Sequence, residues 1–204
     1  MRWPALLTLV ALGACQTAPD TADRWFADAD RIAPTTTKAW VCHGFGCHYR
    51  NTVTLSRGDR ARMRRIVGRP KSAAAERRRI AKLISWMERR VATTVGSAGD
   101  VGGLDLQNAR VRGQMDCIDE ATNTSSYLMI AQAAGLLRFH TVAGPVSRGF
   151  LIDGRYPHAT AVIRGKDGDF AVDSWPEANG VPPKIVPVSV WFAERPGETQ
   201  KPAR

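Results

Sequence analysis

Apolar residues in the middle of the chain recur every three or four positions, which is the spacing of an amphipathic α-helix. A helix is therefore predicted from about Ser72 to Val95, with arginines on its outer face and five apolar residues on its inner face: Ile80, Leu83, Ile84, Met87 and Val91. A shorter helix is predicted over 57–67, because Ser56 is a typical helix cap. We expect the longer helix to pack its apolar face on the core.

A third helix is predicted to begin at Cys117 and to be buried. Asp116 stands at its capping position, and Asp119 and Glu120 place negative charges in its first turn, where they oppose the positive end of the helix dipole. The stretch 127–137 is apolar nearly all round, with a single polar residue. A helix of that composition belongs in the middle of a domain.

Beyond this helix the hydrophobic pattern changes to a period of two, which is typical of β-strands. Strands are predicted over 138–143, 149–152, 156–163 and 169–175, and an isolated strand-like run covers 52–55. The turns between the later strands are predicted at Asp153-Gly154 and Asp167-Gly168. A buried helix followed by an antiparallel meander indicates an α+β fold, with the helix packed on an antiparallel sheet.

The length of 204 residues suits one domain, which we place at 25–193, followed by a flexible tail at 194–204. The net charge of +10 is high, and much of the basic excess lies between Arg57 and Arg90. Such a charge favours nucleic acid, anionic lipid or an acidic polymer as a partner, but it is more often a solvated helix face. A nucleic-acid partner is not expected.

The first fifteen residues have the layout of a bacterial secretion signal. Met1-Arg2 is basic, residues 5–12 are apolar, and Leu12-Gly13-Ala14-Cys15 resembles a lipobox, in which the cysteine is lipidated after cleavage. The apolar run is too short to span a bilayer as a helix. We therefore expect 1–14 to be removed as a signal peptide and 15–24 to form a lipidated tether. The alternative is an ordinary signal peptide with an incidental cysteine.

Lipidation at Cys15 implies a lipoprotein of the cell envelope that faces the periplasm. Gln16 follows the cysteine, whereas an aspartate there is associated with inner-membrane retention, so the resemblance implies the outer membrane. Several acyl chains on one residue anchor a protein stably, since each buried methylene contributes about 0.8 kcal/mol. The membrane is therefore an expected partner, through this lipid anchor.

An oxidising periplasm favours a disulfide between two nearby cysteines, and Cys42 and Cys47 are the nearby pair. The same segment is a stretched version of a haem-attachment pattern, because His48 follows Cys47, and His43 and His48 offer half of a metal site instead. The disulfide is favoured, and neither a metal nor another cofactor is expected. Cys117 is then left without a partner, which suggests a reactive thiol or intermolecular pairing.

A thiol attacks as the thiolate, and both a helix start and an adjacent imidazolium lower its pKa. Cys117 has the first by position, and His158, on a predicted strand 41 residues later, is the candidate for the second. Asp173, 15 residues further on, is the candidate that orients the imidazole. Depending on the turn, Asp173 pairs opposite Val162 or Thr160, which share a face with His158; the Thr160 register places the two side chains diagonally, within reach.

A cysteine that opens a buried helix, followed by a histidine and an aspartate on successive strands, resembles the transglutaminase-like superfamily. Asp116-Cys117-Ile118-Asp119 is similar to the setting of the nucleophile in bacterial transglutaminase-like cysteine proteases. The resemblance covers about 72–176 and implies a papain-like core. It also implies that Cys117 is the nucleophile, His158 the general base and Asp173 the acid that orients it. The implied activity is hydrolysis or acyl transfer at peptide or amide bonds through a thioester, with a protein or peptide substrate in the envelope.

The oxyanion site is less defined by the sequence. The backbone N–H of Cys117 is a natural donor because helix starts leave such groups free, and Gln114 or Gln107 is the candidate for a second donor. Trp175-Pro176 could form a wall of the cleft or simply pack in the core. The alternative function is a catalytically inactive, basic lipoprotein of the same fold that binds envelope components.

Overall fold

The computed structural model describes four stretches of the chain, at 21–28, 32–103, 107–149 and 157–194. The predicted signal peptide, Cys15 and the residues beyond 194 lie outside the described residues. So do the predicted turn Asp153-Gly154 and three of the four residues of the strand expected at 149–152. Within the four stretches, no helix is long and apolar enough to cross a membrane.

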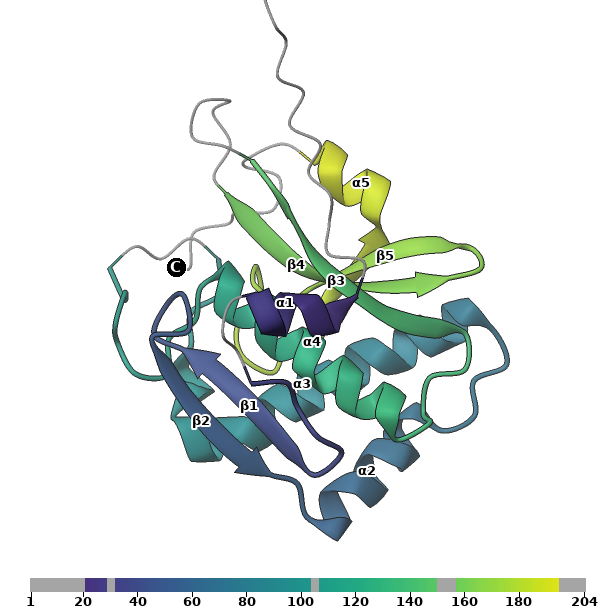
Figure 1. Cartoon of the computed structure of the whole chain (residues 1–204), viewed down its shortest axis with the longest axis horizontal. Helices are drawn as coiled ribbons and strands as arrows, with labels where there is room; N and C mark the ends of the chain where they lie inside the picture. The colour runs from purple at the N-terminus through teal and green to yellow at the C-terminus, as the bar shows by residue number, and fades with distance from the viewer. Residues whose placement is uncertain (1–20, 29–31, 104–106, 150–156, 195–204) are drawn as a thin grey trace, which may run out of the picture.

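Helix α4 (Cys117–Ala133) lies at the centre of the molecule (Figure 1). Thirteen of its seventeen residues are buried, so almost its whole circumference contacts protein. It packs against β1 (Lys38–His43), which forms a hairpin with β2 (Tyr49–Thr54), and against the larger sheet. Helix α3 (Ala73–Val95) also contacts it. The buried helix that the sequence predicts from Cys117 is therefore confirmed.

The larger sheet has four antiparallel strands in chain order: β3 (His140–Arg148), β4 (His158–Gly165), β5 (Gly168–Asp173) and β6 (Lys184–Pro187). This meander on a buried helix confirms the α+β prediction. The turn between β4 and β5 consists of two residues, Lys166 and Asp167, one position earlier than expected. Strand β3 continues five residues beyond its predicted end, through an irregular register between Ala143 and Val146.

The two helices α2 (Arg57–Val67) and α3 begin where the sequence predicts. Ser56 caps α2 in a reciprocal capping box with Asp59, and Ser72 caps α3 through the backbone N–H of Ala75. Their inner faces join those of α4 and both sheets in one hydrophobic cluster. Full burial of such aliphatic side chains contributes about 1.5–3 kcal/mol each.

Helix α1 (Ala22–Asp28) begins inside the tether expected at 15–24. Its side chains explain why: Phe26 is buried, and the indole N–H of Trp25 donates to Thr122 Oγ1 of α4 at 3.0 Å. At the other end of the domain, a short helix α5 (Val188–Ala193) follows β6. The hydrophobic pattern predicted neither of these helices.

A buried carboxylate joins the start of α3 to the start of β3. Glu76 accepts backbone N–H bonds of 2.8, 3.0 and 3.1 Å from Arg138, Phe139 and His140. His140 Nδ1 lies 2.9 Å from the same carboxylate, and its Nε2 faces the guanidinium of Arg77 at 3.1 Å. Because arginine only donates, Nε2 accepts and Nδ1 carries the hydrogen that binds Glu76.

The substitution Glu76→Gln should therefore destabilise the fold by about 2–4 kcal/mol, because an amide NH₂ would face backbone donors in a buried site. Urea unfolding of the wild type and the variant measures this change. Glu177→Gln is the control, since Glu177 is exposed, and it should change the free energy of unfolding by less than about 0.5 kcal/mol. Equal stability of Glu76→Gln and the control would contradict the role of the buried carboxylate.

Candidate active site

His158 and Asp173 lie side by side on neighbouring strands. Ala161 pairs with Val172, and continuing that register by one residue places Asp173 opposite Thr160 and diagonal to His158. This is one of the two registers that the sequence allowed. His158 Nε2 and Asp173 Oδ2 are 2.8 Å apart, and both side chains are buried. The structure therefore brings this predicted pair together.

Two tryptophans enclose the His158 ring. Trp175 packs against it with ring centroids 4.5 Å apart, and Trp191 of α5 lies 5.3 Å away on centroids. Trp191 Nε1 also donates to Asp173 Oδ2 at 2.8 Å, so one carboxylate oxygen accepts from both the imidazole and the indole. Sequence reasoning missed Trp191, whose only local signal is an apolar run near the end of the domain.

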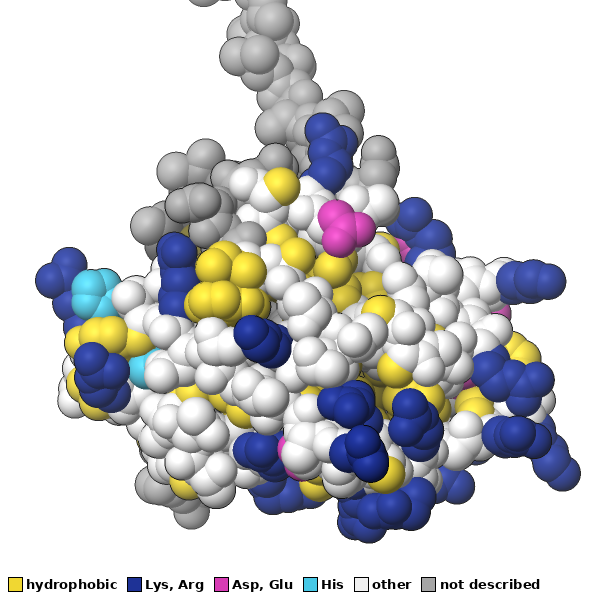
Figure 2. Space-filling view, turned by 60° about the horizontal axis from the view of Figure 1, so that its bottom comes forward, with side chains coloured by type: hydrophobic (Ala, Val, Ile, Leu, Met, Phe, Trp, Pro, Cys, Tyr) yellow, Lys and Arg dark blue, Asp and Glu magenta, His cyan; other side chains and the backbone are white. Residues whose placement is uncertain are grey.

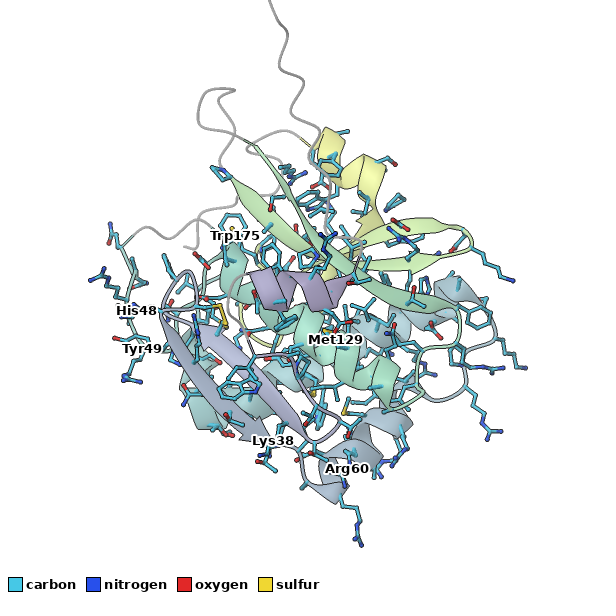
Figure 3. All side chains as sticks on the ribbon, in the orientation of Figure 1. Lys38, His48, Tyr49, Arg60, Met129 and Trp175 are labelled. Carbon is cyan, nitrogen blue, oxygen red and sulfur yellow. A yellow bond between two sulfur atoms is a disulfide. The ribbon has the colours of Figure 1, made fainter. Side chains whose placement is uncertain are left out.

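The Cys117 thiol lies against the beginning of β4. Its Sγ is 3.7 Å from the carbonyl oxygen of Pro157, and Ala159 packs against the same side chain. Cys117, Ala159 and Trp175 form one small apolar cluster, and Figure 3 shows Trp175 between the start of α4 and strand β4. The thiol thus contacts the residues on either side of His158.

The second ring nitrogen of His158, Nδ1, is buried. No hydrogen-bond partner for it lies among the described residues. An unpaired buried ring nitrogen is unfavourable unless a further group uses it, because its lost hydration is not replaced. Since Nε2 is committed to Asp173, Nδ1 is the nitrogen that remains to exchange a proton with another group.

Burial raises the pKa of the Cys117 thiol to about 12. The Ala159 N–H opposes this rise, whereas the charges of Asp116 and Asp173 add to it. The expectation of a low thiol pKa at the helix start is therefore wrong for the structure as it stands, because desolvation outweighs the helix terminus. The resting group is a neutral thiol, and its proton has to be removed when it reacts.

A left-handed loop closed by a disulfide precedes β2. Cys42 and Cys47 are bonded, with Cα atoms 4.5 Å apart, which confirms the predicted pairing. The four residues from Gly44 to Cys47 have φ values of 82°, 69°, 61° and 59°. These angles are unfavourable for Phe45 and Cys47, since only glycine adopts them without steric strain. Figure 3 shows the disulfide beside His48.

This loop holds both aspartates that flank Cys117. Asp119 accepts from the backbone N–H of Phe45 at 2.8 Å and of Cys47 at 2.6 Å, and Asp116 accepts from Gly46 at 3.0 Å. Successive left-handed residues turn their N–H groups into one concavity that suits an anion. The two aspartates also complete the capping box of α4. The Asp116-Cys117-Ile118-Asp119 motif is therefore the contact between the loop and the helix that carries the thiol.

The contacts of His43 do not favour the metal alternative, and the bond between Cys42 and Cys47 does not favour the haem alternative. His43 Nδ1 accepts from the backbone N–H of Gly113 at 3.0 Å, so its Nε2 donates to Asn51 Oδ1 at 2.7 Å and neither nitrogen is left as a ligand. Cys42, Cys47 and Asp119 lie close enough to share an ion, but the two sulfurs are bonded to each other.

The two glutamines predicted as oxyanion donors, Gln114 and Gln107, do not lie in an arrangement that supports that role. The Gln114 amide donates to the Gly99 carbonyl at 2.8 Å and accepts from the Val101 N–H at 3.2 Å, which gives it the role of bracing that loop. Gln107 lies in an exposed turn. The backbone N–H of Cys117, at the first turn of α4, has no acceptor within the helix and remains the better placed donor.

A second set of acidic groups is buried beneath the site. Ser174, next to Asp173, donates to Glu120 at 2.9 Å, and the backbone N–H of Gly180 donates to Glu88 at 2.8 Å. Burial raises the pKa of Glu88 to about 9, with the Glu120 charge adding to it. Burial also raises the pKa of Glu120 to about 7, and Asp173 adds to that shift. Each acid therefore stays protonated to a higher pH than a glutamate in water.

No family model, curated protein or solved structure with which the chain was compared matches it.

Removal of the disulfide and loss of the Asp119 carboxylate should be energetically coupled. Cys42→Ala/Cys47→Ala should lower the free energy of unfolding by about 2 kcal/mol, because the closed loop is short. Asp119→Asn should lower it by about 2–3 kcal/mol, because an NH₂ group would then face the loop donors. Denaturant unfolding of all combinations should give a combined loss smaller than the sum by about 1 kcal/mol or more.

Asp59→Asn is the matched control for this cycle, since Asp59 holds the equivalent capping position in α2 and does not contact the disulfide loop. Its effect should add to that of disulfide removal within about 0.5 kcal/mol. Full additivity for Asp119→Asn as well would show that the loop does not act through that carboxylate.

The protein should lose stability as the pH rises from about 4.5, the ordinary pKa of glutamate, toward about 9. In this window the folded chain keeps the Glu88 proton that the unfolded chain releases, so a rise in pH favours unfolding. Glu88→Gln, which carries no titrating proton, should flatten this slope, whereas Glu177→Gln should not. Urea midpoints across the window measure the effect, and parallel curves for all three proteins would contradict it.

Proposed function

We propose that the protein is a thiol hydrolase or acyl transferase that acts on peptide or amide carbonyls through a thioester on Cys117. The observation that carries the proposal is the His158 ring: Asp173 holds Nε2, Nδ1 is buried without a described partner, and the Cys117 thiol contacts Pro157 and Ala159 on either side. The thiol thus lies beside the strand that carries the base, and Asp173 orients that base, which supports a Cys117-His158-Asp173 triad.

In the first step His158 acts as the general base. Its Nδ1 takes the proton from Cys117 Sγ as the sulfur attacks the substrate carbonyl, so a resting thiol with a raised pKa suffices. The bond between Nε2 and Asp173 fixes the tautomer that leaves Nδ1 free to accept. Trp191 holds the same oxygen of Asp173 and thereby orients the carboxylate.

In the second step the tetrahedral intermediate collapses. The backbone N–H of Cys117 stabilises the oxyanion, and the His158 imidazolium gives its proton to the departing amine, which leaves a thioester on Sγ. Water, or an amine in a transfer reaction, then attacks the thioester with His158 again as base. The product is a carboxylic acid or a new amide, and the thiol is regenerated.

The resemblance to transglutaminase-like cysteine proteases agrees with this chemistry and adds the substrate class, a protein or peptide of the cell envelope. The lipobox-like Leu12-Gly13-Ala14-Cys15 supports an acylated Cys15 on the periplasmic side of the outer membrane. The disulfide between Cys42 and Cys47 is consistent with an oxidising compartment.

Acyl capture tests the mechanism. The protein is incubated with an activated ester of a blocked peptide, and mass spectrometry follows the acyl adduct. The wild type should acquire one acyl group on Cys117, and Cys117→Ala should acquire none. His158→Gln should slow acylation by about 100-fold or more, the usual contribution of a general base, and Asp173→Asn should slow it by a similar factor.

His140→Gln is the matched control, because His140 is also buried and bound to a carboxylate but lies in the Glu76 pair. Its acylation rate should stay within about threefold of the wild type, since it has no role in proton transfer. Near-ultraviolet circular dichroism confirms that each variant is folded. Absence of an adduct on Cys117, or equal rates for wild type and His158→Gln, would leave the inactive envelope-binding protein as the better interpretation.

A further inference from the structure

The net charge of the protein comes from one pair of helices. Thirteen of the 29 basic residues and three of the 19 acidic residues lie within 57–95, the segment of α2 and α3. The remaining chain carries sixteen of each sign, so the whole excess of +10 belongs to this segment. A charge so concentrated is a property of one surface and not of the overall composition.

The three acids of this segment do not neutralise that surface. Asp59 forms an ion pair with Arg90 at 2.9 Å, Glu76 is buried beneath β3, and Glu88 is buried against Gly180. Figure 2 shows the result, with Lys and Arg side chains gathered over one part of the surface and few acidic side chains among them.

The cations border a hollow between the two helices. The hollow has a volume of about 360 Å³ and is lined by five basic residues and by Ile66, Ser85 and Trp86; the basic residues are Arg62, Arg65, Arg79, Lys82 and Arg89. On α3, the stripe 79, 82, 86 and 89 follows the helical repeat, so these side chains share one face. Four of the cations, all but Arg89, have no ion pair or hydrogen bond from their side chains within the described part of the chain.

A second basic hollow lies on another flank of α2. Its volume is about 390 Å³, and Arg64, Arg69 and Arg138 line it together with Leu136 and two glycines. No acidic residue lines either hollow. Helix α2 thus separates two cavities that each gather several guanidinium groups, the side chain best suited to bind phosphate through two N–H bonds at once.

We propose that the α2–α3 surface binds the phosphate headgroups of an anionic phospholipid membrane. The cations that line each hollow are exposed, whereas its apolar side chains are half-buried, Ile66 and Trp86 in one and Leu136 in the other. A headgroup matches this pattern, because its phosphate stands above apolar carbon, and tryptophan is favoured at that boundary. Contact with the bilayer would orient the protein on the membrane, independently of the chemistry at Cys117.

Vesicle binding tests the inference. The chain from Gln16 onward, which lacks both the apolar segment expected to be removed and the acylation site, is sedimented with phosphatidylcholine vesicles that contain or lack phosphatidylglycerol. Binding should be tighter to the anionic vesicles and should weaken as salt is added. Arg65→Gln/Arg79→Gln should weaken the binding to anionic vesicles by about thirtyfold, the effect of two basic residues near such a surface.

Arg110→Gln/Arg112→Gln is the matched control, because it removes the same charge from exposed residues outside both hollows, in the segment that contacts the disulfide loop. Its loss should be about threefold or less, since these charges are screened from the contact. Equal losses in the two double variants would overturn the inference, because net charge alone would then explain binding. No preference for anionic vesicles, or tighter binding to an oligonucleotide at equal phosphate concentration, would overturn it as well.

Discussion

The fold depends on hydrogen bonds between buried acidic side chains and distant backbone segments. Glu76, Asp119 and Glu88 each lie inside the protein, and each accepts a backbone N–H bond from a segment more than 60 residues away in the chain. Because a buried polar group that loses its hydrogen bonds is unfavourable, these bonds favour one arrangement of the segments. Together the three acids attach α3 to β3, α4 to the disulfide loop, and α3 to the segment before β6.

The candidate site uses the same principle with a different donor. Asp173 is as buried as the structural acids, but its donors are the side chains of His158 and Trp191. A donor that is itself titratable turns a stabilising contact into one that can move a proton. The raised pKa of Cys117 has the same origin, since the burial that strengthens the His158–Asp173 bond also disfavours a resting thiolate.

Local signals predicted more of the molecule than long-range ones. Ser56, Ser72 and Asp116 cap their helices through neighbours a few residues away, so the helix starts could be read from the sequence. The His158–Asp173 pair was predictable because one hairpin joins its strands, although the turn itself lies one residue earlier. Strands β1 and β6 and the contact of Trp191 depend on segments distant in the chain, where periodicity carries no information. The sequence predicted a lowered pKa for Cys117, and the structure raises it, because burial depends on tertiary contacts that the local sequence does not show.

The hydrogen bond from Trp191 to Asp173 has a consequence for when the site comes into existence. Trp191 belongs to α5, the last helix of the described chain, and it is fully buried against the His158 ring. Asp173 therefore gains its second hydrogen-bond donor only when α5 has packed against the sheet. The environment of the His158 ring is likewise incomplete until Trp191 lies against it. A chain shortened before α5 would keep Cys117, His158 and Asp173 in its sequence but would lack the indole that holds the carboxylate in place.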